Sequence, residues 1–227
     1  MTALAAPAAP QPPIAARATP NPPKQERARA RVDQALDAAE QLLSAQAAGA
    51  LSLPTIALAA GMPASSLYHF FPSAEAVLVA LVRRYNARLD ALIEQAWPAL
   101  PKQRWQDLVR GVMALGRDFH DRHPTYARLV LRTAAFDGLR RADDAHIVEM
   151  ARRLLVLLQA HFLVPPTPRL DEKLAVAIAI SDRIWALAPP QSGKISDSMF
   201  EESQHAVLAY LSCYLPPLMA RREETVR

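Results

Sequence analysis

The stretch from Ser52 to Ser73, SLPTIALAAGMPASSLYHFFPS, predicts two very short helices joined by a tight glycine turn. Ser52 can cap the first helix with its hydroxyl, and Pro54 falls in the first turn, where a missing N–H costs little. Gly61 supplies the positive backbone angle that ends this helix. Pro72 ends the second helix after about two turns, and helices this short must be held by packing. A helix-turn-helix that places its second helix in a DNA major groove has this design.

The residue order of this segment, IA.AAG.....LYHFFPS.E.VL, resembles the tetracycline-repressor (TetR) family of bacterial transcriptional regulators. The Leu-Tyr-His-Phe-Phe-Pro run makes the resemblance far more specific than a bare helix-turn-helix pattern, and flanking helices extend it to about residues 27–95. The resemblance implies an all-α protein, with a three-helix DNA-binding domain followed by a larger helical domain for ligand binding and dimerisation. The matching residues are Ile56, Ala57, Ala60, Gly61, Leu67, Tyr68, His69, Phe70, Phe71, Pro72, Ser73, Glu75 and Leu78.

The composition agrees with a helical protein of one small and one larger domain. Half of the 227 residues are hydrophobic and only six are Gly, which favours helices over turn-rich sheets. The single Cys213 excludes an internal disulfide and predicts a buried thiol, with a cross-link between partner chains as the alternative. No apolar run is long enough to cross a membrane and no secretory signal is evident, so we expect a cytoplasmic protein. The net charge of +4 permits nucleic-acid binding without requiring it.

The chain divides into three parts. Residues 1–23 hold seven Pro and eight Ala, which predicts a disordered or polyproline-like arm that can also be a neutral leader. Residues 24–72 form the expected DNA-binding domain, and residues 73–227 the ligand-binding and dimerisation domain. Apolar residues at helical spacing predict a first helix from Lys24 to near Gly49 and a fourth from Ser73 to about Gln95. Further helices are expected at about Arg104–Asp121, Pro124–Arg132, Asp143–Phe162, Arg169–Ala188 and Asp197–Tyr214.

The resemblance places the DNA contacts on the second short helix and on the helix starts around it. Tyr68 can reach a phosphate through its phenol, although such a residue can also be a half-buried packing residue. Thr55 and the N–H groups near Ser52 and Ser73 suit phosphate oxygens, because helix N-termini attract anions. The candidates on the second helix are Ala64, Ser65, Ser66, Tyr68 and His69.

The helix-turn-helix departs from the family pattern in its charge. Between Leu51 and Ala74 the sequence contains no Lys, Arg, Asp or Glu, whereas family members often carry a basic residue where Ala64 and Ala74 stand. Phosphate neutralisation must then come from elsewhere, because it sets much of the affinity for DNA. An ordinary solvated face is the alternative role for the nearby basic residues. The expected source is Lys24, Arg27, Arg29 and Arg31, together with Arg17.

The larger domain supplies the predicted partner and ligand surfaces. Apolar faces on Arg169–Ala188 and Asp197–Tyr214 predict a four-helix homodimer interface, although they could instead complete the core of the monomer. A two-fold dimer predicts a palindromic operator in double-stranded DNA. Met and aromatic residues in the middle helices are candidates for an effector pocket, with plain core packing as the alternative. These pocket candidates are Met113, Phe119, His120, Tyr126, Phe136, Met150 and Trp185.

Metal, cofactor and catalytic sites are not predicted. His120 and His123 lie three residues apart, but no Cys or paired carboxylates join them at a metal-binding spacing. The sequence lacks a phosphate loop, a Gly-x-Ser-x-Gly elbow, His-Glu-x-x-His and a dinucleotide fingerprint, so we expect no enzyme. The adjacent pairs Asp143–Asp144 and Glu201–Glu202 are interpreted as helix caps or solvated surface.

The sequence therefore predicts a ligand-responsive transcriptional regulator. It would act as a repressor that binds its operator as a dimer and is released by a small hydrophobic effector. Two alternatives stay open: an architectural DNA-binding protein without an effector, and a ligand-binding or protein-interaction module that has lost operator recognition. The uncharged second helix is the feature that keeps the last alternative open.

Overall fold

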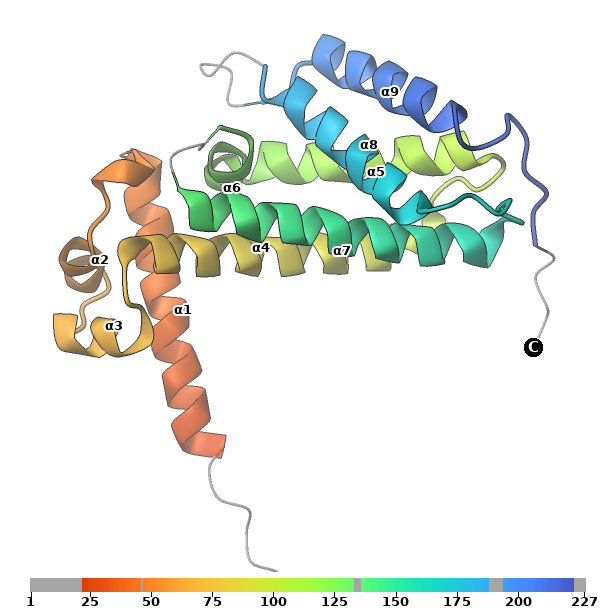
Figure 1. The fold of residues 1–227 in the computed structure, drawn as a ribbon. Helices are drawn as coiled ribbons and strands as arrows, with labels where there is room; N and C mark the ends of the chain where they lie inside the picture. The colour runs from red at the N-terminus through yellow and green to blue at the C-terminus, as the bar shows by residue number, and fades with distance from the viewer. Residues whose placement is uncertain (1–21, 46, 133–135, 188–193, 223–227) are drawn as a thin grey trace, which may run out of the picture.

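The structure, a computed structural model, describes residues 22–45, 47–132, 136–187 and 194–222. Within these ranges the chain is helical, and its isolated β-bridge joins Phe162 to Arg221. The predicted fold class, all-α with a three-helix unit followed by a larger helical domain, is confirmed (Figure 1). The α-helices are α1 Pro22–Ala45, α2 Leu53–Ala59, α3 Ala64–Phe70, α4 Ala74–Ala96, α5 Trp105–Arg122, α6 Pro124–Ala127, α7 Asp137–His161, α8 Leu170–Trp185 and α9 Asp197–Ser212.

The first three helices form a unit that we call the head, in which caps and a glycine turn set the path of α2 and α3. The Thr55 N–H donates to the Ser52 hydroxyl at 3.3 Å, and Gly61 has a φ of 62° between the two helices. Gln34 of α1 donates from Nε2 to the Ala60 carbonyl at 2.7 Å, which satisfies an acceptor at the end of α2. The predicted cap at Ser52 and turn at Gly61 are thus confirmed.

Burial of one apolar face on each short helix holds the head together. Ile56 of α2 and Leu67 of α3 are fully buried, as are Ala35 and Ala39 of α1. Full burial of an Ile or Leu side chain contributes about 1.5–3 kcal/mol relative to an exposed one. Since a seven-residue helix is unstable alone, this packing fixes the orientation of α3 and leaves its other face to solvent.

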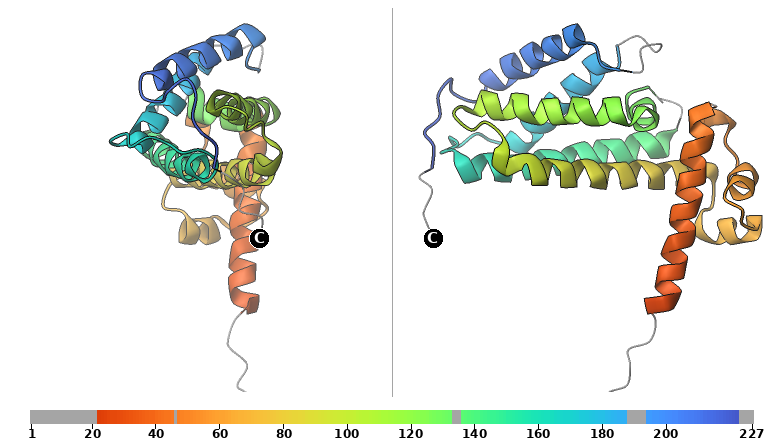
Figure 2. Two further views of the ribbon diagram at one scale, coloured as in Figure 1. Left: turned by 90° about the vertical axis from the view of Figure 1, so that its right-hand side faces the viewer. Right: turned by 180° about the vertical axis from the view of Figure 1, so that it is seen from behind.

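The helices α4 to α9 form a second unit, which we call the body, and α4 joins it to the head. Ser73 caps α4 by accepting the Ala76 N–H at 3.1 Å, as its sequence predicts. The helix then runs without a break along the body (Figure 1). It packs against α7, α7 packs against α8, and α8 packs against α9. In both side views α9 lies on the side of the body away from α4 (Figure 2).

Polar contacts tie α4 back to α1. The guanidinium of Arg84 pairs with Asp37 at 2.6 Å and with Glu40 at 3.0 Å. The Tyr85 hydroxyl donates to the Glu40 carboxylate, and burial together with this carboxylate raises the pKa of Tyr85. Arg84 and Tyr85 are well covered by the protein, so solvent screens these contacts less than surface ion pairs. A movement of α4 therefore carries the whole head with it.

Three local predictions differ from the structure. The helix α7 begins at Asp137 rather than Asp143, because the carboxylate of Glu75 on α4 accepts the Gly138 N–H at 2.6 Å. The helix predicted at 124–132 is divided into α6 and a π-helical turn, Arg128–Arg132. The prediction of a buried Cys213 thiol is wrong, because this residue follows α9 on the exposed surface.

Other predictions fall partly outside the described residues. Of the arm predicted at residues 1–23, the described part begins at Pro22, which already lies in α1. The structure also describes no side chain for Lys24. In the described part of the chain, no single helix is long and apolar enough to span a membrane. The helix pair Ala64–Phe70 and Ala74–Ala99, bent by 62°, reaches that length and apolar content only when its two members are taken together.

Candidate DNA-binding surface and effector cavity

The exposed face of α3 carries neutral polar side chains. Ser65 and His69 are exposed, and Tyr68 has 54% of its surface accessible. On the opposite face, Leu67 is fully buried and anchors the helix. Ala64 begins α3 and is exposed, while Ser66 is partly covered. Hydroxyl, phenol and imidazole groups can all exchange hydrogen bonds with base edges and phosphates, so this face is chemically suited to a DNA groove.

The hydroxyls predicted to meet phosphates already have partners inside the head. The Ser52 Oγ lies 2.6 Å from the Thr55 Oγ1 and also accepts the Thr55 N–H. The Ser73 Oγ accepts the Ala76 N–H at 3.1 Å. A hydroxyl that accepts one hydrogen bond still has a proton and a lone pair to offer. Their contact with DNA stays a prediction, and the structure assigns them the role of helix caps.

Positive charge near this face comes from α1. Its N-terminal half projects past α2 and α3, away from the body (Figures 1 and 2). Arg27, Arg29 and Arg31 are exposed on this projecting part, and none of them forms an ion pair with another described residue. Guanidinium groups in this state are free to neutralise phosphates. The same helix therefore offers the charge that the helix-turn-helix lacks.

A cavity of about 80 Å³ lies in the body between α5, α7, α8 and α9. Its wall is almost entirely apolar, and the side chains of Trp97, Leu158 and Leu174 in that wall are buried. Apolar cavities of this kind stay dry and accept apolar ligands. We call it the apolar end of the effector cavity, with further walls formed by Leu108, Val109, Val112, Met113, Leu154, Ala177, Ile178, Ser181, Val207 and Leu211.

A second hollow of about 70 Å³ shares Val112, Met113 and Leu154 with the first, and we call it the polar end. Its walls include Leu89 and Ile93 of α4. It also contains groups that can ionise or donate hydrogen bonds, which come from α5, α6, α7 and α8. These are His120, Tyr126, Asp143, His146, Ser181 and Asp182.

The ionisable groups of the polar end have strongly altered proton affinities. Burial raises the pKa of Asp182 to about 8 and that of Asp143 to about 6, with the neighbouring carboxylate of Asp143 raising Asp182 further and that of Asp144 raising Asp143. Burial lowers the pKa of His120 to about 4, with a smaller contribution from His123. Desolvation disfavours the charged form of each group, so the cavity opposes ionisation of both its acids and this base.

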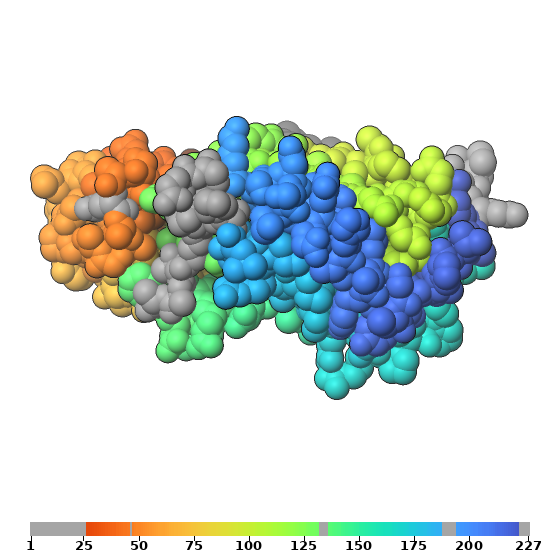
Figure 3. Space-filling view, turned by 90° about the horizontal axis from the view of Figure 1, so that it is seen from above, coloured from red at the N-terminus to blue at the C-terminus, as the bar shows by residue number. Residues whose placement is uncertain are grey.

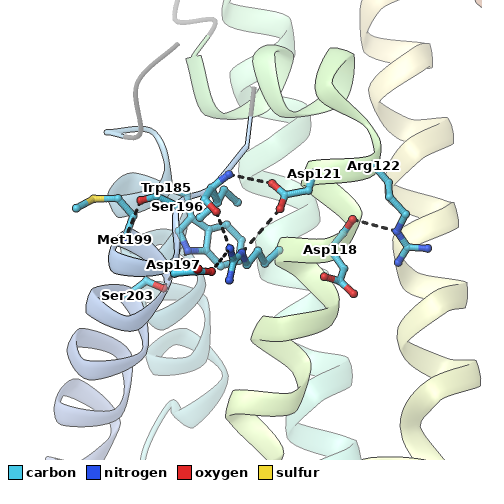
Figure 4. A network of polar contacts seen from close by, with 10 residues as sticks. Asp118, Asp121, Arg122, Trp185, Ser196, Asp197, Met199 and Ser203 are labelled. Atoms are coloured by element: carbon cyan, nitrogen blue, oxygen red, sulfur yellow. Dashed lines mark hydrogen bonds and ion pairs between the residues drawn. The ribbon is translucent and has the colours of Figure 1, made fainter. Parts of the chain in front are cut away.

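A polar network joins α5 to the segment before α9, and Trp185 of α8 to α9 (Figure 4). Arg117 of α5 pairs with Asp197 of α9 at 2.6 Å and donates to the Ile195 carbonyl at 2.9 Å. Asp121 of α5 accepts the Ile195 N–H at 2.9 Å. Trp185, which lines the polar end, donates from its indole N–H to the Ser203 hydroxyl at 2.9 Å. These contacts bind the segment before α9 to α5, and hold one wall of the cavity in place.

Five of the seven predicted pocket residues line the polar end: Met113, His120, Tyr126, Met150 and Trp185. Their contact with an effector stays a prediction. Phe119 and Phe136 do not line either end; Phe119 instead packs its ring against Tyr85 and His123. The two carboxyl groups were missed, because Asp143 was interpreted as a cap or solvated surface and Asp182 was passed over. The sequence signal for Asp182 was an acidic residue two positions after the apolar run 174–180.

The head matches a known family. Residues 35–81, from the second half of α1 to the first turns of α4, match the sequence profile described as bacterial regulatory proteins, tetR family. The head is of the TetR-family type. This match supports a DNA-binding transcription regulator by class. The resemblance inferred from the LYHFFPS motif is thereby confirmed.

Solved structures of bacterial regulators share the fold of about four fifths of the chain. A regulator from Streptomyces coelicolor is 24% identical, with a TM-score of 0.61 over 82% of this chain and 98% of its own. One from Rhodococcus sp. RHA1 is 17% identical, with a TM-score of 0.62 over 82% and 97%. The fatty acid degradation regulator FadR from Bacillus halodurans is 16% identical, with a TM-score of 0.57 over 78% and 94%. A comparison with curated proteins found no match.

Proposed function

We propose that this TetR-family protein is a ligand-responsive repressor that binds a palindromic operator as a dimer. One observation carries the proposal: α4 follows the DNA-facing helix α3 at its start and lines the effector cavity with Leu89 and Ile93 further along. A ligand that contacts one end of a rigid helix can shift the other end. An architectural DNA-binding protein has no need of such a cavity, so the cavity favours the regulator over that alternative.

The release step would act on the position of α4. An effector that binds better to a second arrangement of α4 shifts the population toward it, and only differential affinity produces the shift. Glu75 of α4 accepts a hydrogen bond from the Gly138 N–H of α7, so a shift of α4 relative to α7 would stretch or break this bond. A Cβ added to Gly138 would come within 2.4 Å of the Glu75 Oε1, so the Glu75 side chain would have to move away from any larger residue here. Movement of both α4 helices in a dimer would change the spacing of the two α3 helices.

The dimer would form through α8 and α9. These two helices adjoin on one face of the body (Figure 3). Val176 of α8 is 45% exposed, and partly exposed Ile180 and Leu208 lie on the same two helices. Val176→Glu should convert the dimer to monomers in sedimentation experiments, whereas Val156→Glu on exposed α7 should not. Equal dimerisation of both variants contradicts this interface.

DNA binding is tested first with purified protein and the DNA upstream of its own coding sequence, in a salt titration. Tight binding to a palindrome that Tyr68→Phe and His69→Ala weaken supports the proposal. Weak binding that ignores sequence would favour an architectural role. A complete lack of binding would favour a module that has lost operator recognition, and attention would move to the cavity.

A further inference from the structure

The polar end of the effector cavity holds two acids without a basic partner. Asp143 of α7 and Asp182 of α8 line it together, and among the described residues no Lys or Arg pairs with either carboxyl group. The rest of the wall is largely apolar and aromatic. Two ionised carboxylates are unfavourable in such surroundings, so without a cation burial holds these acids toward their neutral forms. No described side chain supplies that cation, so a cation that pairs with both acids would come from a ligand.

A buried base on the same wall is also without a partner. His120 has 5% of its surface accessible, and its Nδ1 has no hydrogen-bond partner among the described residues. Its ring stacks on Tyr126 with centroids 5.2 Å apart and meets the edge of Trp185 at 5.4 Å. Buried polar atoms in native proteins are nearly always satisfied. A lining side chain with an unsatisfied nitrogen, beside two acids, therefore marks a place for a polar ligand group.

We propose that the polar end binds the protonated amine or quaternary ammonium head of a single-chain amphiphile, whose apolar chain fills the apolar end. This assignment rests on the proposed function, because it names the chemical class of the effector. Aromatic side chains, which attract cations, also line the polar end, among them Trp185. Val112 and Met113 line both hollows, which places the apolar end next to the acids, where the chain of such a ligand would lie. Neither a fatty acid nor a neutral alkane would satisfy both ends.

The proton affinities of the acids agree with this assignment. A carboxyl group with a pKa near 8 is mostly neutral at pH 7, and a cation placed beside it restores the charged form and releases a proton. The groups that face Asp182 are Asp143 and His146 from α7, His120 from α5 and Tyr126 from α6. None of these carries a positive charge when His120 and His146 are neutral, and burial lowers the pKa of both histidines.

The test compares three ligands that differ only in the head group: n-octylamine, 1-octanol and octanoate. Binding to the full-length protein is measured by calorimetry. Octylamine should bind at least about tenfold more tightly than octanol, since close charge pairs in buried sites couple by more than about 1.4 kcal/mol. Asp182→Asn and Asp143→Asn should each reduce this preference and leave octanol binding unchanged. Asp144→Asn, on the exposed neighbour, should keep it.

Equal binding of octylamine and octanol, or tightest binding of octanoate, would overturn the assignment. So would a preference for octylamine that survives both asparagine substitutions. Release of operator DNA is measured separately in the same samples. Octylamine that binds with the expected preference but releases no DNA upholds the cation site and contradicts the regulatory mechanism. A different ligand that releases DNA while octylamine fails to bind upholds the regulator and contradicts the cation site.

Discussion

The head and the body distribute charge in opposite ways. The DNA-facing unit α2–α3 has no charged residue, although its predicted partner is a polyanion. The interior of the body, where apolar side chains are expected, contains Asp143 and Asp182 beside a cavity. In the proposed function, shape recognition lies on α3 and charge neutralisation on α1. The body keeps two acids, held toward their neutral forms by burial, beside a cavity. The contrast shows that the location of charge, rather than its total, indicates what each region binds.

The largest expected effect tests the uncharged head. Replacing Arg27, Arg29 and Arg31 together by Gln should weaken operator binding about 100-fold at moderate salt, because three phosphate contacts would be lost. Each lost contact should also reduce the slope of log affinity against log salt concentration by about 0.9. Affinity is measured by fluorescence anisotropy across a salt series. The same charge change on the exposed Arg110, Arg140 and Arg152 of the body should have little effect. Similar losses for both triple variants would show that total charge, and not α1, drives binding.

The next effect tests the charged interior. Asp182→Asn should raise the free energy of unfolding by on the order of 2 kcal/mol at pH 8. The folded-state pKa of Asp182 is about 8 against an ordinary 3.8, so its cost to stability grows as pH rises from about 4 to about 8. The gain should therefore be small at pH 5. Denaturant unfolding at both pH values checks this, and a loss of stability at pH 8 would show that the carboxylate has a stabilising partner.

A smaller effect tests the neutral face of α3. Tyr68→Phe with His69→Ala should lower operator affinity about tenfold, because one or two hydrogen bonds to DNA contribute about 1–2 kcal/mol. Both residues are exposed, so the melting temperature should hardly change. Leu58→Ala, on the 83% exposed Leu58 of α2, serves as the matched surface control. An unchanged affinity would show that another part of the head recognises the operator.

The smallest effect concerns the contact between the two regions. Gly138→Ala should break the bond to Glu75 and cost about 1 kcal/mol of stability, since the added Cβ, 2.4 Å from the carboxylate oxygen, would displace the Glu75 side chain. Effector-induced release of DNA should fall several-fold while the separate affinities for DNA and ligand stay nearly constant. Glu75→Gln keeps an acceptor oxygen and should behave almost like the natural protein. Unimpaired release in Gly138→Ala would exclude this route of coupling.

The head was predictable from sequence because its determinants are local. A capping Ser52, a glycine with positive φ and a proline after α3 act on residues within a few positions of themselves. The cavity depends on residues from five helices, and no local rule shows that Asp143 and Asp182 face the same hollow. The start of α7 was misplaced for the same reason, since its cap comes from Glu75, 63 residues away. The exposure of Cys213 likewise depends on how α9 packs.

The contacts of Arg84 with Asp37 and Glu40 constrain how this protein could be rebuilt as a hybrid sensor. A chain cut between the helix-turn-helix and α4 would leave Arg84 with a foreign α1, and Arg128 would lose the Leu43 carbonyl to which it donates. Any graft of a new DNA specificity should therefore exchange only α2 and α3, and retain the native α1 surface that meets α4. The segment that can be exchanged, α2 and α3, is therefore shorter than the three-helix head.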